Sequence, residues 1–233
     1  RMMGALSGGA WAAHMISDLG DGRFDGAWLA QNFETLQPEK AIWDKYANLF
    51  AHADTERERF LEFERWWNGY YTLSREEILG ITQNLFIGNR LEQGEMQLDA
   101  HCTVDLKRIS NPLIIFASDG DNITPPEQAM GWIGKLYPDT DALKAAGQRI
   151  VYMTHPRVGH LGIFVSGSVA RLQHRAILES LDDVEALSPG LYEMVIDNPS
   201  GDPDCETGDF EVRFEPREVD DLGIASDDAA LKQ

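Results

Sequence analysis

The chain has few cysteines and no long apolar run. Cys102 and Cys205 are the two cysteines among its 233 residues, and both lie in loop-like sequence. A chain of this length needs no disulfide to fold, and such low cysteine usage is typical of a reducing compartment, so we expect two plain thiols and a cytoplasmic protein. The strongly apolar stretches span four to six residues. A membrane-spanning helix needs about 20, so the sequence predicts no membrane segment.

The chain also lacks the motifs that mark secretion, metal binding and phosphate binding. It begins Arg1-Met2-Met3 with no signal peptide, and we expect a fragment or a processed piece of a longer protein. The histidines show no ligand spacing and no Cys-x-x-Cys occurs, so no metal site is expected. Gly8-Gly9 alone is not a phosphate-binding fingerprint, so no cofactor is expected.

Basic residues are scarce in the last quarter of the chain. The net charge is −19, and residues 179–233 hold seventeen acidic and three basic residues. This acidity argues against nucleic acid and anionic membrane surfaces as partners. The favoured interpretation is a solvated acidic tail that aids solubility.

Short apolar runs alternate with helical patterns from residue 103 onward. Residues 112–117 and 149–154 predict strands, while the segment from Pro125 to about Leu136 and residues 168–181 predict helices. This alternation favours an α/β fold with a parallel sheet and flanking helices.

The pattern loosens after residue 181. Two stretches, 191–196 and 210–215, alternate like strands, and a loop rich in Asp, Pro and Gly separates them. We therefore expect a partial α/β domain over 1–181, followed over 182–233 by a small β appendage and an acidic, partly disordered tail.

Residues 38–93 are the most aromatic part of the chain and predict a helical insert. Phe60, Phe63 and Trp67 have i, i+3, i+7 spacing, and Ser74 with Glu77 forms a capping box ahead of an apolar run. Two interpretations stay open for the aromatic side chains. They pack a core, or they form a cap over an active site that holds an apolar ligand.

Asp121 and His160 are the candidate catalytic pair. Asp121 follows the strand 112–117 and His160 follows the strand 149–154. Because parallel strands end at the same edge of a sheet, the carboxylate can orient the imidazole as a general base. Asp119 is a weaker candidate for the acid, and His155 is interpreted as structural. The alternative for Asp121 is a plain turn or helix cap.

The nucleophile of such a triad is harder to find. Ala5-Leu6-Ser7-Gly8-Gly9 matches the small-x-Ser-x-Gly elbow and is followed by a helical pattern. An elbow also needs a buried strand before the serine, and only Arg1 to Gly4 precede it. Ser7 is therefore a weak candidate, and Cys102, which has no elbow glycine, is weaker.

Several motifs resemble known proteins. Ser118 to Pro125 (SDGDNITP), Asn84 to Leu91 (NLFIGNRL) and Gly159 to Gly167 (GHLGIFVSG) are similar to the C-terminal part of poly(3-hydroxyalkanoate) synthase relatives. Together with Phe60 to Trp67 (FLEFERWW) they resemble most closely the DUF3141 branch of the α/β-hydrolase superfamily. The resemblance covers nearly all of residues 4–215.

The resemblance implies the C-terminal part of an α/β-hydrolase fold with a nucleophile, an acid and a histidine. Asp121 and His160 match the acid and histidine positions, and the nucleophile is expected upstream of this chain. The implied function is acyl transfer or ester hydrolysis on a hydroxyacyl ester or thioester, with an acyl-CoA as a possible donor. The alternative is a catalytically inactive hydrolase-like scaffold that binds a protein or a granule. No signal indicates the oligomeric state.

Overall fold

The chain divides into two compact units, Arg1–Met96 and Gln97–Gln233. A computed structural model describes residues 9–36, 38–121, 123–160, 162–165, 167–198, 201 and 210–223. Among these residues, no helix is both long enough and apolar enough to cross a membrane.

Cys102 is an exposed free thiol, and Cys205 lies outside the described residues.

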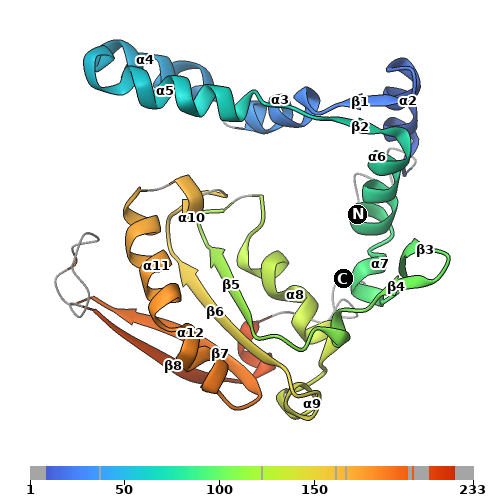
Figure 1. Ribbon diagram of the computed structural model, residues 1–233, viewed down its shortest axis with the longest axis vertical. Helices are drawn as coiled ribbons and strands as arrows, with labels where there is room; N and C mark the ends of the chain where they lie inside the picture. Colours follow the sequence, from blue (N-terminus) through green and yellow to red (C-terminus); the bar gives the residue numbers. More distant parts are fainter. Residues whose placement is uncertain are drawn as a thin grey trace, which may run out of the picture. The chain divides into compact units, whose positions relative to one another are not determined.

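The first unit is mainly helical (Figure 1). Its elements are α2 (Trp11–Leu19), β1 (Arg23–Asp25), α3 (Ala27–Leu36), η1 (Glu39–Asp44), α4 (Lys45–Ala51), α5 (Ala53–Trp67), β2 (Thr72–Ser74), α6 (Arg75–Ile81), η2 (Thr82–Ile87) and α7 (Arg90–Gln93). The strands β1 and β2 form an antiparallel ribbon in which Phe24 is paired with Leu73. The helical insert expected over 38–93 is thus helical, apart from β2.

The capping box predicted at the start of α6 is present. The Ser74 hydroxyl accepts the backbone N–H of Glu77, and the Glu77 carboxylate accepts the backbone N–H of Ser74. These two bonds satisfy N–H groups that the first turn of a helix leaves without partners, which explains why the helix begins there.

The aromatic side chains of this unit are only partly covered. Phe63 stacks on Trp67 with ring centroids 6.0 Å apart, and Trp67 Nε1 donates to Glu34 at 2.9 Å. Among the described residues of the unit, the buried apolar side chains are Phe24 and Ile78, whereas Trp66 is 59% exposed. The Trp67–Glu34 bond therefore joins α5 to α3, whereas the Phe63–Trp67 stacking lies within α5, and neither contact forms an extended core within this unit.

The second unit is built on a four-stranded sheet in the order β5-β6-β7-β8 (Figure 1). The strands are β5 (Leu113–Ser118), β6 (Arg149–His155), β7 (Gly190–Asp197) and β8 (Glu211–Arg217), and the flanking helices are α8 (Pro126–Leu136), α9 (Thr140–Ala145), α10 (Gly162–Val165), α11 (Gly167–Glu179) and α12 (Leu181–Ala186). Short turns of 3-10 helix lie at η3 (Leu106–Arg108) and η4 (Val219–Leu222), and β3 (Met96–Asp99) pairs with β4 (Cys102–Val104). Strands β5, β6 and β7 are parallel and β8 is antiparallel, so the predicted α/β class with a mostly parallel sheet is confirmed.

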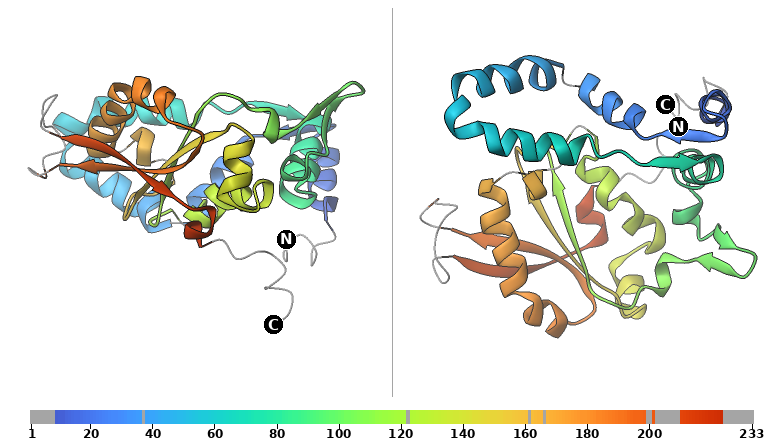
Figure 2. Two further views of the ribbon diagram at one scale, coloured as in Figure 1. Left: turned by 90° about the horizontal axis from the view of Figure 1, so that it is seen from below. Right: turned by 45° about the horizontal axis from the view of Figure 1, so that its top comes forward.

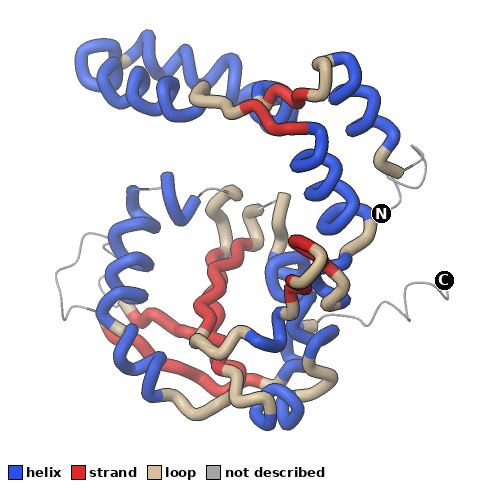
Figure 3. Tube along the Cα trace, turned by 45° about the vertical axis from the view of Figure 1, so that its right-hand side comes forward, coloured by secondary structure: helices blue, strands red, loops and turns tan. Residues whose placement is uncertain are grey.

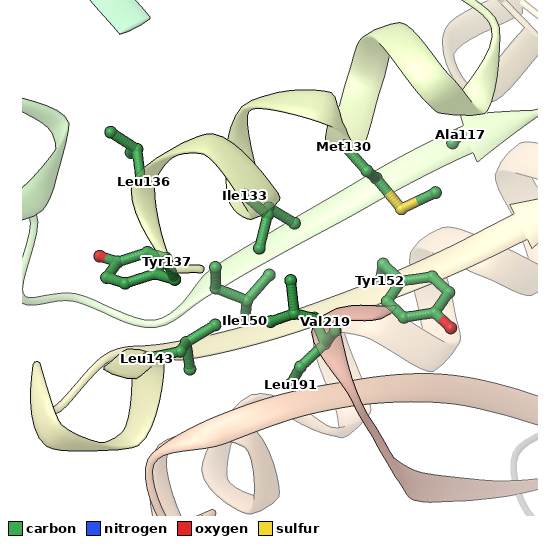
Figure 4. Close-up of a cluster of buried hydrophobic side chains, with 10 residues drawn as sticks. All are labelled: Ala117, Met130, Ile133, Leu136, Tyr137, Leu143, Ile150, Tyr152, Leu191 and Val219. Carbon is green, nitrogen blue, oxygen red and sulfur yellow. The ribbon is translucent and has the colours of Figure 1, made fainter. Parts of the chain in front are cut away.

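Helices cover both faces of this sheet (Figures 2 and 3). On one face α8 and η4 pack on β6 and β7, and the cluster includes Ile133, Ile150, Leu191 and Val219 (Figure 4). On the other face α11 and α12 pack on the same strands, and the second cluster is Val151, Met153, Ala176, Val184, Met194 and Phe210. Alternate side chains of β6 therefore pack into two separate cores, as expected for a strand in the middle layer of an α/β fold.

The strands after residue 181 belong to the main sheet. The sequence placed them in a small appendage, but β7 pairs in parallel with β6, and its antiparallel pairing with β8 extends over seven residue positions. Leu191 and Met194 are 1% and 4% exposed and join opposite cores. Because apolar side chains on both faces of β7 are buried, the strand is more stable within the main sheet than in a separate appendage. The acidic stretches 202–209 and 224–233 lie outside the described residues.

Candidate functional site

Asp121 lies in the loop that follows β5, as the sequence predicted. Its Oδ1 accepts the backbone N–H groups of Ile123 at 2.8 Å and Thr124 at 2.9 Å. Its own N–H donates to the Ser118 carbonyl, which closes the turn. This arrangement is an Asx turn, in which the carboxylate shapes its own loop. The side chain is 9% exposed, so the loop holds it away from solvent.

His160 lies in the loop that follows β6 and meets this carboxylate. Its Nδ1 is 2.9 Å from Asp121 Oδ2. An ionised carboxylate can only accept, so the Nδ1–H donates, and in this tautomer Nε2 is the ring nitrogen that carries the lone pair. The ring is 36% exposed, which gives a reacting group access. The structure therefore brings together the two residues that the sequence singled out.

The sheet explains why these loops meet. β5 and β6 are parallel neighbours, and their last residues, Ser118 and His155, are register partners. Both loops leave the same edge of the sheet (Figure 1). The acid and the histidine thus need only three and five residues beyond their strands to come into contact.

The environment of Asp121 favours its charged form. Burial by itself raises the pKa of the carboxyl, but hydrogen bonds from the Thr124 N–H, the His160 ring and the Ile123 N–H lower it, and the net shift is downward. A carboxylate that remains ionised at neutral pH can fix the imidazole tautomer and stabilise the imidazolium that forms when Nε2 takes a proton.

A second set of contacts fixes the distance between the two loops. The buried Ser118 hydroxyl lies 2.8 Å from the His155 carbonyl oxygen and 2.7 Å from that of Val158. The Asp119 N–H donates to the same His155 carbonyl at 3.0 Å. Gly120 is so close to the other loop that a Cβ there would lie 2.5 Å from the Arg157 carbonyl carbon. Only glycine permits this approach of one backbone to the other.

The remaining sequence candidates are placed differently. Ser7 lies outside the described residues. Asp119 contributes its backbone N–H to the contact between the loops, and Cys102 is an exposed residue of β4. Within the described part of the chain, no group of three His, Cys, Asp or Glu side chains could hold a metal ion.

Sequence reasoning missed the residues that connect the loops. The sequence indicated only that Ser118 and Gly120 form a turn beside Asp121, and no pattern marked Val158 as a contact residue. The partners of Ser118 are 37 and 40 residues away, so a local pattern could not reveal them. A serine that ends an apolar strand was the available clue.

Comparisons with known proteins find a matching family and two similar proteins. A family described as "Protein of unknown function (DUF3141)" matches residues 1–231. An "Uncharacterized protein in ackA 5'region" of Rhizobium meliloti is 46% identical over 226 residues, which cover 95% of this chain and 31% of that protein. The "Poly(3-hydroxyalkanoate) polymerase subunit PhaC" of Haloferax mediterranei is 26% identical over 149 residues, 62% of this chain and 28% of that protein. The chain thus spans about a third of the length of these relatives, and no solved structure matches it.

Proposed function

The chain belongs to the DUF3141 family, and we propose that it supplies the acid and the histidine of an acyl-transfer or ester-hydrolysis site. The observation that carries the proposal is the Asp121–His160 hydrogen bond of 2.9 Å between loops that follow adjacent parallel strands. The similarity to a protein named as a poly(3-hydroxyalkanoate) polymerase subunit supports an acyl substrate.

In the proposed reaction, His160 Nε2 takes the proton of a serine or cysteine nucleophile that a part of the full-length protein outside this chain provides. The nucleophile adds to the carbonyl carbon of a hydroxyacyl ester or thioester, and the carbonyl oxygen becomes an oxyanion. When the tetrahedral intermediate collapses, the bond to the leaving alcohol or thiol breaks and His160 returns the proton to that group. Water or a second hydroxyl then accepts the acyl group by the same steps.

Asp121 has a distinct role in this scheme. Its Oδ1 is committed to the backbone of its own turn, and its Oδ2 receives the His160 Nδ1–H. The imidazole therefore cannot rotate or change tautomer without losing this bond. Preorganisation of this kind raises the rate because no rearrangement is needed when charge develops.

The helical unit is proposed to bind apolar ligands through its aromatic side chains. It carries partly exposed aromatic side chains, among them Trp43 at 72% and Trp66 at 59%. Apolar and aromatic surface of this kind suits an aliphatic acyl chain. An acyl-CoA is the proposed donor for acyl transfer, and no metal or organic cofactor is required by the scheme.

Turnover by the full-length protein tests the proposal. The probes are p-nitrophenyl butyrate, followed at 405 nm in the usual manner, and 3-hydroxybutyryl-CoA, followed by release of free thiol. We expect His160→Gln to lower kcat by about 10³-fold or more, because the general base is lost. The matched control is His101→Gln, an exposed histidine in the turn before β4.

Two results would contradict the scheme. Turnover that does not differ between folded wild type and folded His160→Gln would contradict the role of His160, and its absence in both proteins would favour the alternative of a binding scaffold for a protein or granule. Turnover by the isolated 233-residue chain that disappears in Ser7→Ala would show that the nucleophile is Ser7 and is not supplied from outside the chain.

A further inference from the structure

His155 is the last residue of β6, and its ring takes part in the backbone structure of the loop that carries His160. Its Nδ1 accepts the backbone N–H of Arg157 and the backbone N–H of Val158, each at 3.2 Å. One ring nitrogen thus receives donors from the residues two and three positions later.

The same pattern occurs at the end of the neighbouring strand. Asp121 Oδ1 accepts the N–H groups of Ile123 and Thr124, also two and three positions later. Aspartate and asparagine commonly shape turns in this way, because their side-chain oxygen lies at the right distance from those N–H groups. In the His160 loop, an imidazole nitrogen occupies the position of that oxygen.

This role defines the protonation of His155. A nitrogen that accepts two N–H groups has its lone pair directed at them, so the ring is neutral and its proton is on Nε2. The surroundings agree with a neutral ring. Burial lowers the pKa of His155 below its usual value, and the positive charge of Arg157 lowers it further.

The turn that His155 stabilises determines where His160 lies. The Val158 N–H is one of its donors, the Val158 carbonyl faces the Ser118 hydroxyl at 2.7 Å, and a Cβ on Gly162 would lie 2.5 Å from the Val158 Cβ. Val158 is therefore held on the side of its N–H by His155, on the side of its carbonyl by the Asp121 loop, and at its side chain by the start of α10. His160 lies between Val158 and Gly162 in the chain, so these contacts hold both ends of the segment that carries it.

We propose that His155 is a positioning residue, whose Nδ1 holds the 155–158 turn in the shape that places the His160 ring against Asp121. It touches no substrate and transfers no proton. This inference rests on the proposed function only for its effect on turnover, because the effect on the His160 ring exists whether or not the protein is an enzyme.

The test uses three variants of the full-length protein that differ in whether residue 155 has a side-chain acceptor atom and how far that atom lies from the backbone. His155→Asn retains an acceptor oxygen at the length that suits these two N–H groups. His155→Gln places its oxygen one carbon farther, and His155→Ala has no acceptor. We expect kcat for p-nitrophenyl butyrate to stay within about threefold of wild type in His155→Asn. In the other two it falls by about tenfold to a hundredfold, because displacement of a catalytic group by about 1 Å has effects of that size.

The kinetics separate positioning from general damage. KM should change less than kcat in His155→Ala and His155→Gln, since the ring of His160 acts in the chemical step. In a His160→Gln background the further loss caused by His155→Ala should disappear, because a residue that acts through His160 has no effect once His160 is gone. If His155→Ala does not fold, the comparison of His155→Asn with His155→Gln carries the test.

A measurement that needs no activity accompanies the kinetics. In protein labelled with ¹⁵N at the histidine rings, nitrogen shifts should report an Nε2–H ring for His155 and an Nδ1–H ring for His160. The His160 signals should persist in His155→Asn and shift toward a tautomer mixture in His155→Gln. Unchanged His160 signals in His155→Gln, or equal losses of kcat in His155→Asn and His155→Gln, would overturn the inference. Absence of turnover in all proteins, with the predicted ring signals, would instead overturn the proposed function alone.

Discussion

Replacement of Asp121 by asparagine is the sharpest perturbation that the structure suggests. The two side chains have nearly the same shape, so the packing around residue 121 is retained. The local turn decides which way the amide points. Its oxygen must accept the N–H groups of Ile123 and Thr124, which now meet Oδ1 at 2.8 and 2.9 Å, and its NH2 group must then face His160.

An NH2 group cannot accept the His160 Nδ1–H. The imidazole therefore changes to the tautomer with its proton on Nε2, where it can accept from the amide but cannot take a proton from a nucleophile. A wrong tautomer of this kind lowers kcat by about 10⁴-fold in serine proteases, which corresponds to about 5.5 kcal/mol in the activation free energy. We expect a loss of about 10³- to 10⁴-fold here, with KM changed far less.

The assay is the steady-state hydrolysis of p-nitrophenyl butyrate by the full-length protein between pH 6 and pH 9, conditions chosen so that a shifted pH optimum cannot hide activity. Asp119→Asn is the matched control, because this neighbour is exposed and uses only its backbone N–H in the contact with β6. A folded Asp121→Asn protein that keeps kcat within about threefold of wild type, as Asp119→Asn should, would refute the reasoning on the tautomer.

Three further predictions concern stability. Gly120→Ala should lower the free energy of unfolding by about 1–3 kcal/mol, because its Cβ would meet the Arg157 backbone at 2.5 Å. Urea titration measures this loss. The control is Gly80→Ala, which should not be destabilised because a Cβ there meets nothing within 4 Å. Ser74→Ala should reduce the stability of the helical unit by about 1 kcal/mol through loss of the cap, which thermal unfolding followed by circular dichroism can detect; no change would argue against the capping box. Because the pKa of Asp121 is lowered in the folded state, its stabilising contribution is complete above the unfolded value of about 3.9 and is lost as the pH falls through the folded value. Asp121→Asn should therefore flatten the acid limb of a stability–pH curve, and curves of the same slope would contradict this assignment.

The sequence predicted the elements whose patterns are local. The alternation of apolar runs and helices located β5, β6, α8 and α11, and Ser74 with Glu77 located the start of α6. The three-residue strands β1 and β2 were missed, since a segment such as 23–25 is too short to show a period. The π-helical segments η1 and η2 were missed as well, because no composition distinguishes them from α-helix.

Long-range pairing was the part that the sequence could not supply. The alternating pattern of 191–196 predicted a strand but not its partner, and β7 belongs to the main sheet where a small β appendage was expected. The contact between Asp121 and His160 was an exception, because it followed from the rule that parallel strands end at one edge of the sheet. The contacts of Ser118 with the other loop depend on the register between β5 and β6, which local sequence patterns do not reveal.

The two interpretations of Asp121 turn out to describe different atoms of one side chain. A turn former needs a single acceptor oxygen, and Oδ1 fills that need with two backbone N–H groups. A residue that orients a histidine needs another acceptor, and Oδ2 is available because the first need is already met. Asparagine satisfies the first requirement and fails the second, whereas glutamate would reach the histidine but misplace the turn. Aspartate is the residue that meets both, so the Asx turn is the reason that the carboxylate is aimed at His160.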